Sequence, residues 1–262
     1  VFGGPLANFL LALVIFFSIY TFVGKDFTPA VINEVQKDSP AMAGGLKQND
    51  VILEIDGNKV ESIMDVSKFI TMSTDEIIDF KVKRSYDELI LNIKPNIVPG
   101  EDNLGNKLNK RIVGIKLGAY NNEINHVKLG PAQAIYHAAH EVYYVGVSSL
   151  KYIGAMIFGK ADTSQLGGPI RIAKISGQVA EFGVLAFISM MAYISISLGL
   201  VNLFPIPMLD GGHLMFYAFE KVLGRPLSQN TQEGFFRIGL FLLISLMFFT
   251  TFNDLKDLGL FN

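Results

Sequence analysis

The stretch Asn202-Leu203-Phe204-Pro205-Ile206-Pro207-Met208-Leu209-Asp210-Gly211-Gly212-His213 decides the fold. It closes an uncharged run from Phe182 to Phe204, which is long enough to cross the roughly 30 Å hydrocarbon core of a bilayer. Pro205 and Pro207 each lack a backbone donor and disfavour helix at the preceding residue. The helix is therefore predicted to open just before Asp210. Irregular backbone at membrane depth must be enclosed by protein or wetted by a cavity, so the stretch predicts the wall of an intramembrane site.

Asp210 is the candidate functional residue of this stretch. An ionised carboxylate beside an apolar segment costs several kcal/mol unless it is paired or bound to a cation. The alternative is structural, because Asp is a preferred N-cap and Asp210 could cap a helix over 211–223. The two roles are compatible, since one carboxylate oxygen can cap while the other binds a metal. Asn202 adds an amide on the other side of the break.

The pattern Asn-x-x-Pro-x-Pro-x-Leu-Asp-Gly-Gly-His resembles the second signature of the site-two protease family of intramembrane zinc metalloproteases, in particular the branch called regulator of sigma E protease. The resemblance implies a Zn²⁺ cofactor with Asp210 as its third ligand, and a role for Asn202 in positioning the substrate or the active site. Gly3-Gly4-Pro5-Leu6-Ala7-Asn8 is similar to the family's Gly-x-x-x-Asn segment. Gly167 to Ala173 is similar to the stretch before the family's third span. The residues expected to bind or gate the substrate are Gly3, Asn8, Pro205 and Pro207.

One departure from the family affects the chemistry. The family carries His-Glu-x-x-His, which supplies two zinc ligands and a general base. Here His137 and His140 are three residues apart with Glu141 outside them, so the required spacing fails. Because the chain begins at Val1 without Met, we expect that it lacks the family's first helix. Because the His-Glu-x-x-His motif is missing, we expect it to be inactive as given. The alternative is a homologue that never had the metal centre.

Composition favours a membrane protein. Half of the residues are hydrophobic and 18% are charged, which is unusual for a soluble domain. The net charge of −2 argues against nucleic-acid binding, which requires a basic surface. Cysteine is absent, so disulfides and thiolate metal sites are excluded, and the redox environment stays open.

Three apolar runs are predicted to span the lipid bilayer: Leu6 to Val23, Phe182 to Phe204 and Phe235 to Phe252. Lys221, Arg225 and Arg237 cluster on the side of the membrane that holds Asp210, and the positive-inside rule makes that side cytoplasmic. The first span then runs outward. We expect a multi-pass protein of the bacterial inner membrane, with the region after the first span in the periplasm.

That region is predicted to be a PDZ-like domain. Alternating segments such as 30–35, 50–55, 79–84 and 89–93 are typical of short strands. Ser39-Pro40-Ala41 begins a short helix, and the pattern through Asp56-Gly57 resembles a bacterial PDZ domain. Such domains bind peptide C-termini or segments by β-augmentation. By position, Ala30, Val31 and Ile32 would form the groove strand and 66–72 its helix. The alternative is a domain that only excludes bulky substrates.

The predicted fold class is an α-helical membrane protein with three transmembrane helices and an inserted α+β PDZ-like domain. Its expected segments are a first span (1–23), the PDZ-like domain (24–97), a linker with an edge strand (98–130), an interfacial amphipathic helix and loop (131–181), a second span with the Leu-Asp-Gly site and the following helix (182–223), and a last span with a tail (224–262).

Three functions are compatible with the sequence. The first, implied by the resemblance, is regulated intramembrane proteolysis of single-span membrane proteins such as anti-sigma factors or remnant signal peptides. The second is a catalytically silent PDZ-bearing scaffold that holds membrane clients. The third is a small transporter, which three spans without paired intramembrane charges disfavour.

Overall fold

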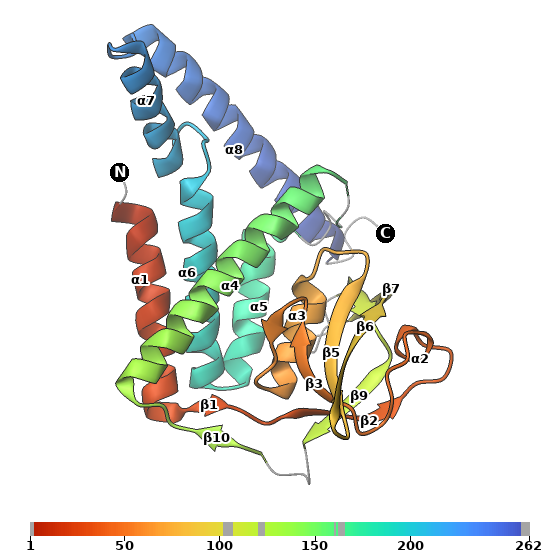
Figure 1. The fold of residues 1–262 in the computed structure, drawn as a ribbon. Coiled ribbons are helices and arrows are strands. Elements are labelled where there is room, and N and C mark those ends of the chain that lie inside the picture. The colour runs from red at the N-terminus through yellow and green to blue at the C-terminus, as the bar shows by residue number, and fades with distance from the viewer. Residues whose placement is uncertain (1–2, 102–106, 120–123, 160, 162–165, 258–262) are drawn as a thin grey trace. The chain divides into compact units, whose positions relative to one another are not determined.

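The computed structural model describes residues 3–101, 107–119, 124–159, 161 and 166–257 (Figure 1). The chain forms two compact units. Unit 1 contains Val1–Ser18, Pro131–Leu150 and Thr163–Asn262, and unit 2 contains Ile19–Gly130 and Lys151–Asp162. Parts of the predicted linker (102–106, 120–123), of the predicted loop (160, 162–165) and of the tail (258–262) lie outside the described residues.

Unit 1 is helical. Its helices are α1 (Gly3–Ser18), the first part of α4 (Pro131–Ile157), α5 (Pro169–Glu181), α6 (Val184–Leu203), α7 (Asp210–Leu223) and α8 (Gln229–Asp257). A π-helical segment, η1 (Ile19–Val23), extends α1 into unit 2. The described residues contain three helical stretches long and apolar enough to cross a membrane, Gly3–Val23, Val184–Leu203 and Gln229–Lys256. They coincide with the three runs predicted from sequence.

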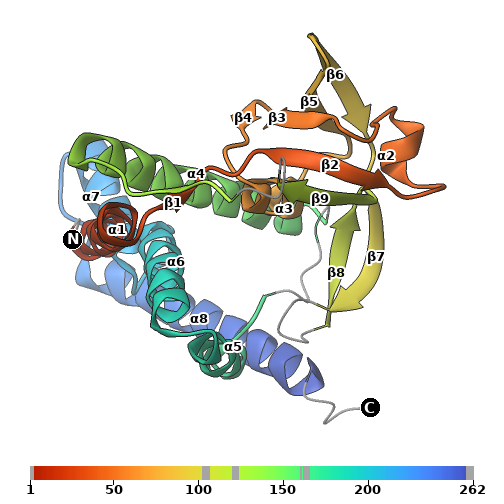
Figure 2. The same ribbon diagram turned by 90° about the horizontal axis from the view of Figure 1, so that it is seen from below.

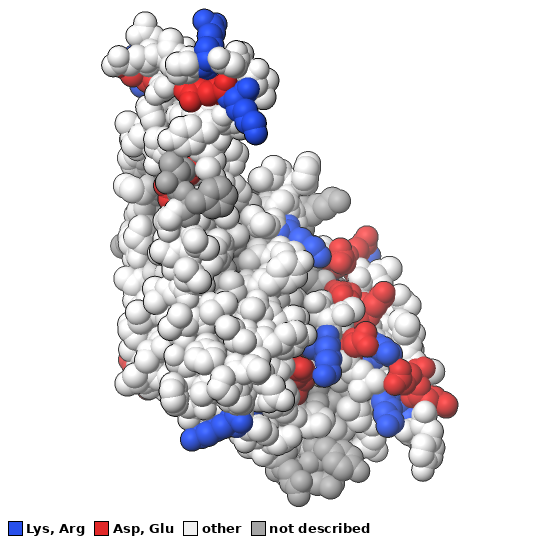
Figure 3. Space-filling view, turned by 60° about the vertical axis from the view of Figure 1, so that its left-hand side comes forward, with Lys and Arg blue, Asp and Glu red and all other residues white. Residues whose placement is uncertain are grey.

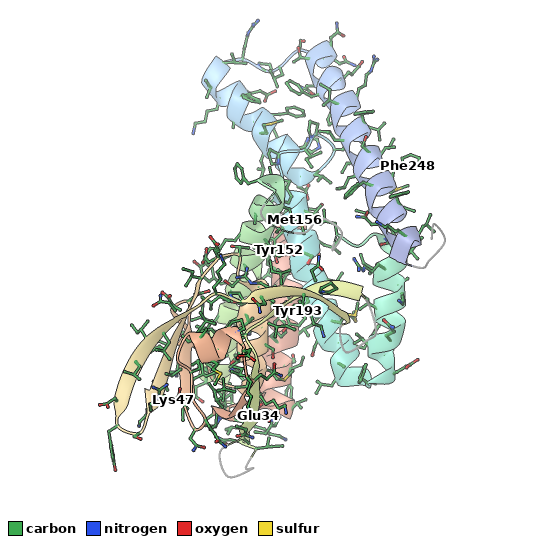
Figure 4. The ribbon with its side chains drawn as sticks, turned by 90° about the vertical axis from the view of Figure 1, so that its right-hand side faces the viewer. Glu34, Lys47, Tyr152, Met156, Tyr193 and Phe248 are labelled. Carbon is green, nitrogen blue, oxygen red and sulfur yellow. The ribbon has the colours of Figure 1, made fainter. Side chains whose placement is uncertain are left out.

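Charge is distributed unevenly over unit 1. Figure 3 shows a wide uncharged face over its helices and charged side chains gathered where α7 meets α8. The charged residues around this connection are Glu220, Lys221, Arg225, Glu233 and Arg237. Phe248, labelled on α8 in Figure 4, is one of many exposed apolar side chains on the last helix. An uncharged surface with such residues is what lipid-facing helices require.

Helices α1 and α6 pack closely along their length. The ring of Phe9 lies 3.0 Å from the position a β-carbon would take at Gly199. Ala12 and Ala192 are completely buried, and the Ser195 hydroxyl donates to the Asn8 carbonyl at 2.8 Å. Small residues and a hydroxyl at a helix interface permit this close backbone approach. The pair fixes the N-terminal end of α1 relative to the C-terminal half of α6.

Two helices lie between the domain and the second span in the chain, and the first of them, α4, is the helix predicted within 131–181. α5 was not predicted as a helix; it follows Gly167-Gly168 and ends at a turn in which Gly183 has a φ of 107°. The part of α4 in unit 1 buries one face, formed by Ala134, Ala138, Glu141, Val145 and Ser148. The Tyr193 hydroxyl of α6 donates to Glu141 at 3.0 Å (Tyr193 is labelled in Figure 4). α4 is therefore held to α6 by a partly buried polar contact.

Unit 2 is built on an antiparallel sheet (Figure 2). The strands are β2 (Ala30–Val35), β3 (Val51–Ile55), β5 (Ile78–Arg84), β6 (Asp87–Ile93) and β9 (Ile115–Ala119), ordered β6-β5-β3-β2-β9, with β4 (Asn58–Lys59) beside β3. Two further strand pairs are β7 (Asn96–Glu101) with β8 (Lys107–Ile112), and β1 (Lys25–Asp26) with β10 (His126–Val127). The core of unit 2 contains the fully buried side chains of Ile32, Ile55 and Phe80.

Two short helices complete unit 2 as the sequence predicted. α2 (Pro40–Ala43) is capped by Ser39, whose hydroxyl accepts from the Met42 amide. α3 (Ile63–Met72) starts with a capping box formed by Ser62 and Asp65. The loop after α2 is held by a partly buried ion pair, in which Arg84 donates to both oxygens of the buried Asp50 carboxylate at 2.8 Å. These hydrogen bonds raise the pKa of Arg84 above its ordinary value.

The segment 98–130, predicted to be a linker, is a structural part of unit 2. In place of the single edge strand expected in this linker, the structure has two strands, β8 and β9, separated at Gly114. Gly114 has a φ of 83°, and a β-carbon there would lie 2.4 Å from the Ser39 side chain. A glycine is required at this turn because the backbone of Gly114 is in the left-handed region and lies close to Ser39, the N-cap of α2. The prediction of a boundary at residue 97 is therefore corrected.

The predicted groove strand is also corrected. Ala30, Val31 and Ile32 lie in β2, which pairs with β3 on one side and β9 on the other. All three residues are buried. A strand with both edges paired cannot accept an added peptide strand. Among the described strands, β9 pairs on one side only, and it is next to β2 in the sheet.

Candidate active site

The proline pair opens the chain between α6 and α7, as the sequence predicted. α6 ends at Leu203, and Phe204 is extended with φ −63° and ψ 143°. The Ile206 amide donates to Phe204 at 2.7 Å and the Leu209 amide to Ile206 at 3.0 Å, so the break is a series of tight turns. Met208 has a φ of 94°. Such a φ is uncommon for a residue with a side chain and marks local backbone strain two residues before Asp210.

The glycines after Asp210 let α7 fold back onto this break. A β-carbon at Gly211 would lie 2.3 Å from the carbonyl oxygens of Leu203 and Phe204. At Gly212 it would lie 2.4 Å from the Ile206 oxygen. Both approaches are impossible for any larger residue without a backbone shift. The first turn of α7 therefore packs backbone to backbone against the end of α6, which brings Asp210 close to the turn that follows Asn202.

Asp210 lies at the first residue of α7 and does not cap it. The N-cap is Leu209, and no side-chain hydrogen bond caps the helix. Within the described residues, the Asp210 carboxylate has no hydrogen bond or ion pair. A β-carbon at Gly4 would lie only 2.3 Å from Asp210 Oδ2. The N-terminal turn of α1 thus contacts the carboxylate through a residue that has no side chain.

The structure brings some predicted site residues together. Asn202 lies in the last turn of α6 and is half-buried. Asn8 lies one turn after Gly4 and is tied to α6 by its carbonyl. Gly3 has open space around its Cα, because no atom lies within 4 Å of a β-carbon built there. Asp210 and α1 therefore meet specifically at Gly4.

The two prolines are in different surroundings. Pro205 is exposed, whereas Pro207 is buried against α8. A β-carbon at Gly239 of α8 would lie 2.0 Å from the Pro207 carbonyl oxygen. Sequence reasoning missed Gly239 because a lone glycine within an apolar run carries no signal of what it faces. The last helix therefore supports the break directly.

The histidines near the site are engaged in aromatic packing. His213, one turn after Asp210, has its ring 5.8 Å from the ring of Phe236 and 6.2 Å from that of Phe216. His137 and His140 each pack against Tyr136 on α4. None of these rings belongs to a ligand cluster within the described residues.

Zinc needs more ligands than the described residues around Asp210 supply. A catalytic zinc takes three protein ligands and keeps one open position. In the part of the chain that the structure describes, no three His, Cys, Asp or Glu side chains gather to hold a metal ion. Asp210 is a suitable carboxylate without another partner, but it is one ligand. The described residues do not by themselves fit zinc.

These features are those of a membrane protein with an intramembrane site. Apolar helices of membrane-spanning length surround a proline break, and the break presents an unpaired carboxylate to a glycine of a neighbouring helix. The sequence matches the model of peptidase family M50 over residues 1–246, and the chain belongs to this family.

Relatives support this assignment over nearly the whole chain. A relative from Agrobacterium fabrum, named as a candidate zinc metalloprotease, is 39% identical over 98% of this chain and 68% of its own length. A similarly named relative from Bartonella henselae is 34% identical over 97% of this chain and 73% of its own length. Metalloprotease MmpA of Caulobacter vibrioides is 32% identical over 99% of this chain and 68% of its own length.

Solved structures match only a part of the chain. The PDZ domain of an SdrC-like protein from Listeria innocua is 24% identical and covers 36% of this chain and 99% of its own, with a TM-score of 0.29. The corresponding domain from Listeria monocytogenes is 25% identical and covers 35% of this chain and 88% of its own, with a TM-score of 0.28.

Proposed function

We propose that this chain acts in an intramembrane zinc metalloprotease that cleaves single-span membrane proteins, such as anti-sigma factors or remnant signal peptides. The observation that carries the proposal is the approach of Asp210 Oδ2 to Gly4 at the proline break. An unpaired carboxylate is costly beside apolar helices, and its retention is explained if it binds a cation. Membership of family M50 supports peptidase chemistry.

In this proposal Asp210 supplies one zinc ligand. Zinc bound at such a site would polarise a water molecule and a peptide carbonyl. Among the described residues, no group of three His, Cys, Asp or Glu side chains includes Asp210, so no catalytic step is derived through the metal. This chain positions the Asp210 carboxylate. The strained turn at Met208 precedes it, and Gly211 and Gly212 pack against the backbone at the end of α6 and in the proline break.

The chain's second contribution is a place for unwound substrate. A helical substrate hides its peptide carbonyls in its own hydrogen bonds and must unwind before attack. The break leaves extended backbone at Phe204, next to Asn202. We propose that an extended substrate segment lies along 202–207 or along 3–8, with the Asn202 amide donating to a substrate carbonyl. A hydrogen bond of this kind stabilises the developing oxyanion most strongly where water is excluded.

The chain's third contribution is peptide binding by the PDZ-like domain in unit 2. β9 is unpaired on one side among the described strands, and α3 packs near β9 as well as β2. An extended peptide C-terminus or segment would add to β9 rather than to β2, as β-augmentation requires a free edge. We further propose that this domain is periplasmic and that the three apolar helices cross the bacterial inner membrane, because Lys221, Arg225 and Arg237 favour a cytoplasmic site.

The test is cleavage of a single-span substrate by the complete protein in proteoliposomes. Asp210→Asn keeps the size of the side chain and removes its charge, and it is expected to abolish cleavage while leaving membrane insertion intact. Glu233→Gln, an exposed carboxylate on α8, is the matched control and should cleave normally. Cleavage by Asp210→Asn at the wild-type rate would refute the ligand role. Absence of cleavage and of zinc from the wild type would favour the catalytically silent scaffold.

A further inference from the structure

A buried carboxylate lies near the C-terminal end of α8, about four helical turns from the contact of α8 with the proline break. Asp254, near the end of α8, is 2% exposed. Its Oδ1 accepts from the Gly168 amide at 2.8 Å, and its Oδ2 accepts from the amides of Ile170 and Arg171 at 3.1 and 3.0 Å. These are free N–H groups of the first turn of α5. The carboxylate of one helix therefore caps the N-terminus of another.

The Gly-Gly-Pro sequence at 167–169 is explained by this contact. A β-carbon at Gly168 would lie 2.7 Å from Asp254 Oδ2 and 3.1 Å from the backbone of Thr250. Pro169 takes the first helical position, where no amide hydrogen is needed. The same arrangement, a Gly-Gly-Pro helix start against an Asp carboxylate, occurs at Gly4 and Asp210. At Asp254 the carboxylate is fully hydrogen-bonded, so its role is to hold a helix.

α8 contacts the rest of unit 1 at several places, including the packing of Phe235 and Phe236 against α7, and two of these contacts bound the segment from α5 to the proline break. Asp254 holds the start of α5, and Gly239 packs against the carbonyl of Pro207. The two points are about 22 Å apart along α8, from the helical rise per residue. Between them the chain runs through α5, the turn at Gly183, α6 and the proline break. Both ends of this segment are thus fixed to one rigid helix.

We propose that Asp254 is a positioning residue: by anchoring α8 to the N-terminus of α5, it sets the register of α8 and thereby the position of Pro207 and Asp210. A helix is stiff along its axis, so a shift at Asp254 is transmitted to Gly239 rather than absorbed between them. A β-carbon at Gly239 would lie only 2.0 Å from the Pro207 carbonyl oxygen, so the two backbones are already in close contact at this end of the segment. Loss of the Asp254 contact therefore displaces the proline break, although Asp254 itself does not contact the break.

The first test measures the distance between α8 and the break. This chain has no cysteine, so Met208→Cys and Ile238→Cys, both exposed, give two labelling sites next to the Pro207–Gly239 contact. Dipolar broadening between spin labels in the complete protein should decrease in Asp254→Ala and, to a smaller extent, in Asp254→Asn. Lys256→Gln, exposed on the same turn, is the control and should leave the spectrum unchanged. Unchanged broadening in folded Asp254→Ala or Asp254→Asn overturns the proposal.

The second test is kinetic and rests on the proposed function. In folded protein, Asp254→Asn should lower kcat by about threefold to tenfold with KM within about twofold, the size typical of remote coupling. A contact that only stabilises the fold would reduce the amount of folded enzyme and leave kcat per folded molecule unchanged, which contradicts the proposal. Failure of the proteolytic function is distinguished from failure of this inference, because the spin-label distance does not depend on activity.

Discussion

Gly4 and Asp210 are 206 positions apart in the sequence, yet a single methyl group at Gly4 would occupy the space of the Asp210 carboxylate, with 2.3 Å between the β-carbon and Oδ2. The proline break, the glycines of α7 and the packing of α1 on α6 all contribute to this approach.

Gly4→Ala is expected to reduce cleavage by the complete protein by about 100-fold, the effect of misplacing a reacting group by roughly 1 Å. The methyl group must push Asp210 or the start of α1 aside. Gly234→Ala, in α8 and outside the proposed substrate segments, is the matched control, because nothing lies within 4 Å of a β-carbon at Gly234. Equal activity of the two variants would show that the approach of α1 to Asp210 has no role. The measurement is the initial rate of substrate cleavage at equal amounts of folded enzyme.

The packing of α1 on α6 predicts a stability effect at Gly199. Gly199→Leu would force a branched side chain into the space of the Phe9 ring, which lies 3.0 Å from the β-carbon position. Overpacking of this kind costs about 1 to 3 kcal/mol. Thermal unfolding in detergent should show a lowered midpoint. Leu198→Ala, at an exposed position on the same turn, should leave the midpoint unchanged; an equal decrease in both variants would mean that the contact is not specific.

The ion pair between Arg84 and Asp50 predicts a stability effect confined to unit 2. Arg84→Met leaves a fully buried carboxylate without its cation, and breaking such a pair costs about 3 kcal/mol or more. Hydrogen exchange measured by mass spectrometry should become faster in β3 and in the loop after α2. Lys83→Met, exposed on the same strand, is the control. Unchanged exchange in Arg84→Met would show that the pair contributes nothing to stability.

The free edge of β9 predicts where peptides bind. Leu117→Arg places a charge on this half-buried strand and should weaken binding of a fluorescent extended peptide to the complete protein by about tenfold, equivalent to roughly 1.4 kcal/mol. Tyr86→Ala, at the exposed tip of the β5–β6 hairpin, should bind like the wild type. If Leu117→Arg binds normally while retaining its fold, the peptide site is not at β9.

The sequence predicted the elements whose signals are local. Apolar length indicated the three long helices, and Pro205 with Pro207 indicated the break. Ser39-Pro40 indicated the start of α2. These features depend on backbone chemistry within a few residues, so no tertiary information is needed.

The sequence did not predict features that depend on distant partners. β2 was taken as an open groove strand because its alternation does not reveal that β9 returns to pair with it. α5 was missed because its N-terminus is capped by Asp254, some 84 residues away, instead of by a neighbouring side chain. The sequence left open an N-cap role for Asp210, and the structure places Leu209 in that position.

The most direct test of the account is the zinc content of the complete protein, measured by inductively coupled plasma mass spectrometry after removal of free metal. The wild type is expected to retain about one zinc ion per chain, and Asp210→Asn to lose most of it, since loss of a ligand weakens a catalytic site strongly. Glu233→Gln should retain zinc like the wild type. Full zinc occupancy in Asp210→Asn, or no zinc in the wild type, would contradict the role assigned to Asp210.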